Sequence, residues 1–357
     1  MLLQNFWILI TIIALYLALV MSTMNKSAST SVTIDSVTSE TLVSEVAPTK
    51  SDTTVIANNK DCISLAAEST ASEQNDATKS CSTSYTGWSD NDEPRMFDQE
   101  KEEKGCKEIV NALTYEELEA MPDQNMPLRH LRADKGDIKK AVKRIKHAIK
   151  WRQDFGVDKI IRAATNPSTD EEKEIHSILK HESSPGKMYV RNHDNSKRAI
   201  LYMFPVKENT NHRKHNIMHL VYALERAIAC TKKNRLEKMV IIMDFKNWKM
   251  KHSAPMATTK ETIHILQECY VERMSRVYFT NAPLIFRTFW NMIKVFVDPE
   301  TKKKIVFCSG KAGEEELKRN FDETKVDACA LGTSDLRAFD VDQYFGTPFD
   351  ETFDELP

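Results

Sequence analysis

The stretch from Ile263 to Phe307 constrains the fold of this chain more than any other feature, because it places an apolar, aromatic segment between two strand-like segments. The segment Leu284–Val295 is too apolar for an ordinary surface helix, which presents only one apolar stripe. Glu272 lies just before the preceding strand and Lys304 begins the following one, so opposite charges flank the segment. An apolar wall with charged residues at its edge suits a ligand with a hydrocarbon body and a polar head. A plain hydrophobic core would also explain the aromatic residues.

From residue 187 onward, strand-like and helix-like segments alternate along the chain. The segment Val240–Phe245 is continuously apolar, as is typical of a strand that is covered on both faces. Strands separated by helices predict an α/β domain with a largely parallel sheet. We expect strands at Met188–Val190, Ala199–Met203, Val240–Phe245, Val277–Thr280 and Ile305–Phe307, and helices at Ile217–Ala229, Thr262–Cys269 and Leu284–Val295.

A helical region precedes this alternating pattern. Thr114 and Glu117 have the spacing of a capping box, which predicts the start of a short helix. Asp137 is a good N-cap for a second helix, whose apolar residues recur at helical spacing on one face. The opposite face is basic, and it suits either anionic lipid headgroups or simple solvation. The basic residues are Lys139, Lys140, Lys143, Arg144, Lys146, Lys150 and Arg152.

The first hundred residues differ from the rest of the chain. Residues 6–21 are almost entirely apolar, and no charged residue occurs before Lys26. Counted from Leu2, this run is just long enough to span a bilayer at about 1.5 Å per residue. We expect a membrane anchor; a signal peptide, or a true start at Met21 or Met24, are the alternatives. Residues 25–104 are rich in Ser and Thr and poor in aromatic residues, which predicts a disordered linker.

Composition and motifs exclude several classes of function. A net charge of −2 argues against a nucleic-acid partner. The seven cysteines form no C-x-x-C pair, which fits a reducing compartment better than a zinc site or a disulfide framework. The chain lacks the glycine-rich phosphate-binding motifs, the G-x-S-x-G nucleophile motif and H-E-x-x-H. We therefore expect no enzymatic activity, no cofactor and no bound metal ion.

Several motifs resemble the CRAL-TRIO domain, the lipid-carrier family of the yeast-type phosphatidylinositol transfer proteins. They are YVERM (270–274), RVYFTNAP (276–283), the F-x-x-x-W of Phe286 and Trp290, and VDPETKKKIVF (297–307). The resemblance extends back through VIIMDF (240–245) and the helical segment 126–157, and it covers residues 110–335.

The resemblance implies an α/β CRAL-TRIO lipid-binding fold, with a helical N-terminal subdomain, a largely parallel sheet as the floor of a pocket, and a gating helix. The expected organisation is an anchor at 1–24, a linker at 25–104, the helical subdomain at 105–165, the lipid-binding domain at 166–335 and an acidic tail at 336–357. The tail could pack on the domain or bind a partner.

The resemblance also implies site residues. Glu272, Lys304, Thr301 and Lys135 fall on positions that contact the inositol headgroup in phosphatidylinositol-binding members. A carboxylate can accept hydrogen bonds from ring hydroxyls, and an ammonium can neutralise a phosphodiester. A structural ion pair between Glu272 and Lys304 is the alternative. Asp134 replaces a residue that is usually basic, which weakens the cationic side of the site.

Two strand positions that carry hydroxyls in phosphatidylcholine-binding members are Met239 and Ile241 here. Neither side chain can hydrogen-bond a phosphodiester, so we expect that a second lipid, if there is one, is not bound in the phosphatidylcholine manner.

The gate and the acyl-chain pocket are expected to use an apolar stripe on one helix face, formed by Phe286, Phe289, Trp290 and Ile293.

The implied function is binding of phosphatidylinositol, with transfer or presentation to a lipid kinase, by a monomer anchored on the cytosolic side of a membrane. A cytoplasmic or peripheral location is the alternative. A tethered scaffold or lipid sensor, or a carrier of a sterol or tocopherol, are the alternative functions.

Overall fold

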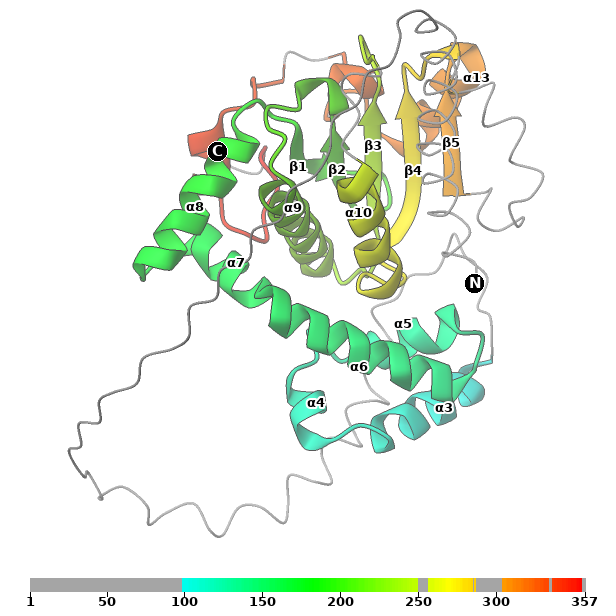
Figure 1. The fold of residues 1–357 in the computed structure, drawn as a ribbon. Helices are drawn as coiled ribbons and strands as arrows, with labels where there is room; N and C mark the ends of the chain where they lie inside the picture. Colours follow the sequence, from blue (N-terminus) through cyan, green and yellow to red (C-terminus); the bar gives the residue numbers. More distant parts are fainter. Residues whose placement is uncertain (1–97, 250–255, 285, 287–303, 334–335, 355–357) are drawn as a thin grey trace, which may run out of the picture.

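The computed structural model describes residues 98–249, 256–284, 286, 304–333 and 336–354 (Figure 1). The expected anchor at 1–24 and nearly all of the expected linker lie outside these residues. So do four expected site residues: Thr301, Phe289, Trp290 and Ile293. Within the described part, no helix is both long and apolar enough to cross a bilayer.

Four helices form an N-terminal unit with its own small core. They are α3 (Gln99–Asn111), α4 (Tyr115–Glu119), α5 (Met126–Ala133) and α6 (Ile138–Phe155). The capping box of Thr114 and Glu117 is confirmed at the start of α4, and the Asp137 side chain caps α6 as expected. Helix α3 begins at Gln99, before residue 105, where the sequence places the start of this unit. Cys106, Ile109, Leu131 and Ile145 are fully buried in the shared core.

A five-stranded sheet forms the centre of the rest of the molecule. Its strands are β1 (Met188–His193), β2 (Ala199–Met203), β3 (Met239–Asp244), β4 (Met274–Thr280) and β5 (Ile305–Cys308), in the order β1-β2-β3-β4-β5. The β1–β2 pair is antiparallel and the other pairs are parallel. The expected α/β class with a largely parallel sheet is therefore confirmed, and every strand predicted from the sequence is present.

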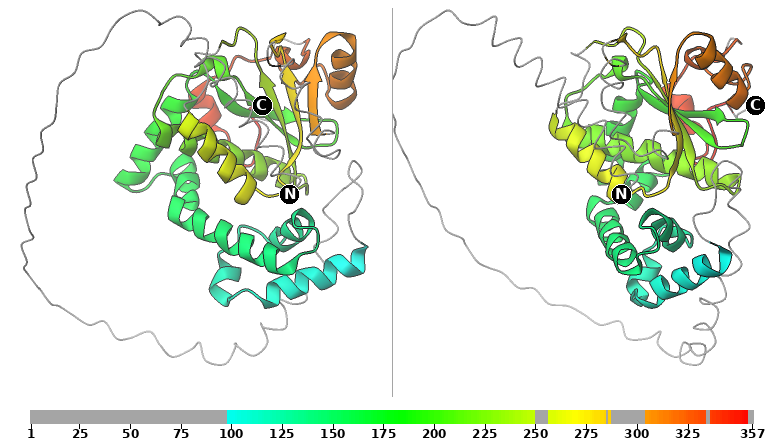
Figure 2. Two further views of the ribbon diagram at one scale, coloured as in Figure 1. Left: turned by 45° about the vertical axis from the view of Figure 1, so that its right-hand side comes forward. Right: turned by 90° about the vertical axis from the view of Figure 1, so that its right-hand side faces the viewer.

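Helices cover both faces of this sheet. In Figure 2, α10 (Met256–Glu268) and α13 (Gly310–Asn320) lie on opposite faces. Helix α9 (Arg213–Lys233) packs against β1, β2 and β3 on its buried side. Helices α7 (Val157–Thr165) and α8 (Asp170–Ser183) pack against each other and against α9. Short 3₁₀ turns occur at Pro205–Lys207 and Ala328–Ala330.

The described part of the acidic tail packs on the domain, which is the first of the two alternatives expected from the sequence. Helix α14 (Val341–Gly346) places Tyr344 against α9, and both Tyr344 and Phe353 are fully buried. The buried Arg226 of α9 lies over the Tyr344 ring, 3.9 Å from its centroid, and donates to the Tyr344 carbonyl at 2.8 Å. A guanidinium that is stacked on an aromatic ring and bonded to tail carbonyls fixes this segment.

The sheet topology brings three chain segments together at one edge. Since β3, β4 and β5 are parallel, their amino ends meet at the same edge of the sheet. Lys238 immediately precedes β3, Glu272 lies two residues before β4, and Lys304 immediately precedes β5. Figure 1 shows α5 and α6 below this edge.

Candidate functional site

Glu272 is the centre of a charged cluster at this edge. Its carboxylate Oε2 lies 2.8 Å from the Lys238 ammonium and 3.7 Å from that of Lys304. The structure thus brings together the glutamate and lysine that the sequence motifs indicate. It also adds Lys238, which the sequence prediction missed. The backbone of Glu272 has a φ of 53°, a left-handed conformation that is uncommon for a residue with a side chain and that recurs at functional sites.

A third cation, Arg132 of α5, lies further from Glu272. It pairs with the buried Glu102 of α3, with Nε–Oε1 at 2.6 Å and Nη2–Oε2 at 2.8 Å. Burial acts to raise the pKa of Glu272, but Lys238, Lys304 and Arg132 outweigh it and lower the pKa to about 2. Glu272 is therefore ionised at neutral pH, and it can accept hydrogen bonds from hydroxyl groups.

The turn between α5 and α6 contains Lys135, the third expected headgroup residue within the described part of the chain. Lys135 has a φ of 55° and an exposed side chain in this turn. Asp134, which the sequence places on the cationic side of the site, is buried and turned toward α6. Its Oδ1 lies 2.9 Å from Arg144 and 3.1 Å from Lys140. Asp134 therefore offsets the charge of α6 side chains.

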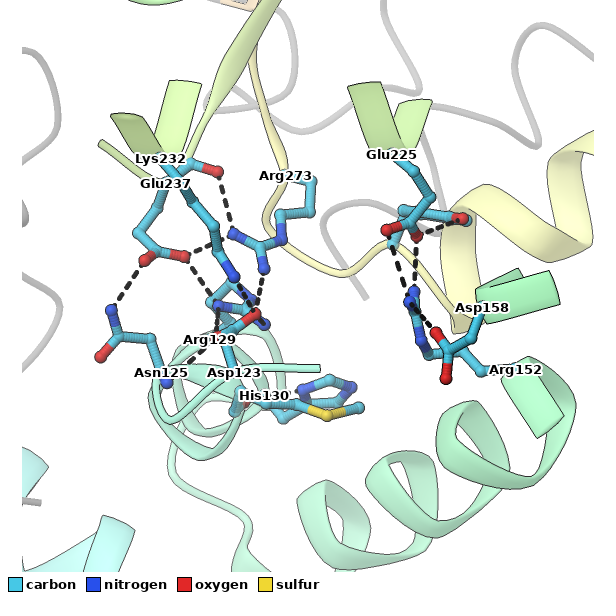
Figure 3. Close-up of polar contacts among 12 residues, drawn as sticks. Asp123, Asn125, Arg129, His130, Arg152, Asp158, Glu225, Lys232, Glu237 and Arg273 are labelled. Atoms are coloured by element: carbon cyan, nitrogen blue, oxygen red, sulfur yellow. Dashed lines mark hydrogen bonds and ion pairs between the residues drawn. The ribbon is translucent and has the colours of Figure 1, made fainter. Parts of the chain in front are cut away.

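A buried ion-pair network joins α5 to the amino ends of β3 and β4 (Figure 3). Arg129 of α5 bonds Asp123 and Glu237, both at 2.7 Å. Arg273 bonds the same two carboxylates, and Lys232 lies 3.0 Å from Asp123. Burial acts to raise the pKa of Asp123, but Arg129 and Arg273 hold it far below its usual range.

This network determines where the cluster around Glu272 lies. Glu237 and Arg273 are the chain neighbours of Lys238 and Glu272, and the Met239 amide donates to the Arg273 carbonyl at 2.9 Å. The two segments that carry the charged site are therefore fixed to each other and to α5.

A second polar contact lies beside the network. Arg152 of α6 bonds Glu225 of α9 at 2.5 Å, and the Tyr270 hydroxyl donates to Glu225 at 2.7 Å. Figure 3 shows the His130 ring between the buried network and the Arg152–Glu225 pair. His130 and residues of both groups line an open pocket of about 200 Å³. Burial lowers the pKa of His130 to about 3, so this imidazole is neutral. Arg144 and Arg152 thus form internal ion pairs, which corrects the prediction that both belong to a solvent- or lipid-facing basic face.

An aromatic cluster occupies the carboxyl side of the sheet. Phe286 is buried, and its ring centroid lies 5.1 Å from Phe245, 5.6 Å from Phe279 and 5.9 Å from Phe307. Of the expected gate and pocket residues, Phe286 is the one within the described part of the chain. Such ring separations are those of favourable aromatic packing. The charged cluster and this apolar cluster thus lie toward opposite ends of the parallel strands.

Residues 183–330 match the family model of the CRAL/TRIO domain. A CRAL-TRIO domain-containing protein of Schizosaccharomyces pombe is 33% identical over 180 residues, which are 50% of this chain and 16% of that protein. The phosphatidylinositol transfer protein PDR17 of Saccharomyces cerevisiae is 26% identical over 215 residues, covering 59% of this chain and 57% of PDR17. The solved structure of Sfh5 superimposes with a TM-score of 0.42 and 17% identity over 59% of this chain and 81% of that chain. The resemblance indicated by the sequence motifs is confirmed by the family model.

Proposed function

We propose that this chain, whose residues 183–330 match the CRAL/TRIO domain, binds phosphatidylinositol and transfers it between membranes or presents it at one. The observation that carries the proposal is the ionised Glu272 held between Lys238 and Lys304 at the amino edge of the sheet. The relative PDR17 is named as a phosphatidylinositol transfer protein, which supports the same ligand. The chain spans 16% and 57% of the two curated relatives described above, so the proposal concerns the shared region.

In this proposal the four headgroup residues expected from the sequence have distinct roles. The Glu272 carboxylate accepts hydrogen bonds from the hydroxyls of the inositol ring, and Lys304 neutralises the phosphodiester. Thr301 supplies a hydroxyl, and Lys135 supplies a further cation from the α5–α6 turn. No bond is made or broken, so the proposed activity requires no catalytic group.

The acyl chains of the ligand would contact the residues expected to form the gate and the acyl-chain pocket. Phe286 belongs to the aromatic cluster at the carboxyl side of the sheet. We propose that Phe289, Trp290 and Ile293 extend this apolar surface along one helix face and form the gate. In the closed state they would contact the acyl chains, and in the open state the bilayer, so exchange depends on their different contacts with water and lipid.

The anchor at 1–24 would hold the domain on the cytosolic side of its membrane, with a lipid kinase as a candidate recipient.

Lipid extraction and mass spectrometry of the purified full chain test the ligand. We expect phosphatidylinositol to be enriched over its share of the host membrane lipids, because Glu272 and Lys304 select its headgroup and not that of phosphatidylcholine. Enrichment of a sterol or another apolar molecule would contradict the headgroup assignment and support a carrier of the alternative class. Absence of any bound lipid would favour a scaffold.

A further inference from the structure

The open pocket of about 200 Å³ lies where the helical unit meets the sheet domain, and Figure 3 draws its charged lining residues. Helices α5, α6, α7 and α9 and the segment 269–273 contribute to the lining. A water molecule takes about 30 Å³ in the liquid, so the pocket has room for one small molecule but not for a diacyl lipid. Its apolar wall includes Met126, Ile161, Ile228 and Val271.

The buried network beside this pocket has one more cation than it has carboxylates. Arg129 and Arg273 both bond the same two carboxylates, those of Asp123 and Glu237. Lys232 lies 3.0 Å from Asp123, and within the described residues this is its one ion pair. Three cations therefore share two carboxylates. One positive charge remains unbalanced in a setting that contains little water, where such a charge matters more than at an open surface.

The other side of the pocket has no comparable surplus in its buried part. Arg152 pairs with Glu225 at 2.5 Å, and these side chains are 11% and 9% exposed. Asp158 lies 3.8 Å from Arg152, but its side chain is 83% exposed, so water screens its charge. The unbalanced charge next to the pocket is therefore positive, and it lies on the side of Lys232.

Lys232 is the cation of the network that is most open to a ligand. It lines the pocket, and its side chain is 34% exposed, compared with 3% for Arg129 and 6% for Arg273. An ammonium group has three N–H donors, so the contact with Asp123 leaves donors for a second acceptor. Burial lowers the pKa of Lys232, and Arg273 and Arg129 add to this effect, which Asp123 does not offset. A bound anion would stabilise the charged form of Lys232.

His130 lines the same pocket and has an acceptor atom without a partner. Its Nδ1 lies 2.9 Å from the Met126 carbonyl, so Nδ1 carries the proton and Nε2 is an acceptor. Nε2 has no hydrogen-bond partner among the described residues, and the side chain is buried. Buried acceptors normally receive a hydrogen bond, so a ligand with a hydroxyl donor suits this wall of the pocket.

We propose that this pocket binds a small hydroxy acid with a single carboxylate. The carboxylate accepts hydrogen bonds from Lys232 and balances the surplus charge, the hydroxyl donates to His130 Nε2, and the short carbon chain contacts Met126 and Ile228. Glu272, Lys238 and Lys304 do not line this pocket. The site is therefore separate from the headgroup cluster, and the inference does not rest on the proposed function.

Isothermal titration of the full chain with 3-hydroxybutyrate tests the ligand class. We expect saturable binding with a Kd of about 1 mM or lower. Butyrate lacks the hydroxyl and 1,3-butanediol lacks the carboxylate, so each should bind at least about tenfold more weakly.

Variants of Lys232 test the position of the ligand. Lys232→Met should lower the affinity for 3-hydroxybutyrate at least about tenfold, and Lys232→Arg should retain it. Because Lys232→Met leaves two arginines facing two carboxylates, its melting temperature without ligand should stay close to that of the wild type. Lys233→Met is the matched control, since the neighbouring Lys233 pairs with Glu351 and does not line the pocket. Lys304→Ala should also retain binding.

Several results would overturn this inference. They are no saturable binding of 3-hydroxybutyrate by the wild type, equal affinities for 3-hydroxybutyrate and butyrate, and unchanged affinity in a folded Lys232→Met variant. Loss of binding in Lys304→Ala but not in Lys232→Met would assign the anion to the headgroup cluster and would also overturn it. Should Lys232→Met fail to fold, Lys232→Gln replaces it, and full affinity in that variant contradicts the inference. Phosphatidylinositol binding is measured separately, so failure of the proposed function is distinguishable from failure of this one.

Discussion

Replacing both Lys238 and Lys304 by alanine is expected to weaken phosphatidylinositol binding by roughly 2–4 kcal/mol, or about 30- to 700-fold. The double change removes the two cations closest to Glu272, so the phosphodiester loses its partner and the Glu272 carboxylate remains as an uncompensated negative charge. Titration of the chain with phosphatidylinositol-containing vesicles measures the loss.

The single change Lys304→Ala should cost less than the double change, because Lys238 still lies 2.8 Å from Glu272 and keeps that carboxylate paired. The losses of affinity caused by Lys238→Ala and by Lys304→Ala should therefore not sum to the loss in the double variant, as is expected for residues that share one partner. Lys173→Ala, which removes a lysine from an exposed ion pair on α8, is the matched control and should leave binding unchanged. Unchanged binding in a folded double variant would mean that the cluster is a structural ion pair.

Asp123→Asn is expected to lower the free energy of unfolding by about 3–5 kcal/mol. Asp123 is the carboxylate that Arg129, Arg273 and Lys232 share. Without its charge, Arg129 and Arg273 keep Glu237 as a partner, whereas Lys232 loses the carboxylate that it pairs with. At about 2–4 °C per kcal/mol, the melting temperature should fall by roughly 6–20 °C. Thermal unfolding followed by circular dichroism measures this change.

Lowering the pH should reduce the difference in the free energy of unfolding between the Asp123→Asn variant and the wild type. The pKa of Asp123 is held far below its usual range in the folded chain, so its stabilisation is complete above the unfolded value of about 3.9 and is lost as the pH falls below it. The difference in stability should be full at pH 7 and smaller at pH 3. The matched control is Asp154→Asn, because Asp154 forms an exposed i, i+4 pair with Lys150 and should change stability by about 0.5 kcal/mol or less. Equal effects of the two substitutions would show that the network does not stabilise the fold.

The sheet could be predicted from the sequence because its strands are nearly continuous apolar runs. Val240 and Ile242 are fully buried in β3, and such residues leave a clear pattern in the sequence. Helix α8 was missed although it has a detectable start signal, since Thr169 and Glu172 form a capping box. The packing of the tail was not predictable, because it depends on the long-range contact between Arg226 and Tyr344.

The candidate site was predicted only in part. Glu272 and Lys304 were found because they lie in motifs that resemble a family pattern. Lys238 was missed because it belongs to a charged stretch that is typical of a surface loop. Only the parallel pairing of β3 with β4 shows that it directly precedes a strand beside Glu272. Its position immediately before an apolar strand, the same position that Lys304 has, is the signal that could have revealed it. The network of Asp123, Arg129 and Arg273 was missed for the same reason, since charged residues are usually exposed.

Transfer of labelled phosphatidylinositol between donor and acceptor vesicles by the full chain tests the central claim most directly. We predict transfer above the spontaneous rate, and a fall to near that rate when Lys238 and Lys304 are both replaced by alanine. Phosphatidylcholine should be transferred far less efficiently. Transfer of phosphatidylinositol at the same rate by the folded double variant and by the wild type, or no transfer and no binding by the wild type, would contradict the account.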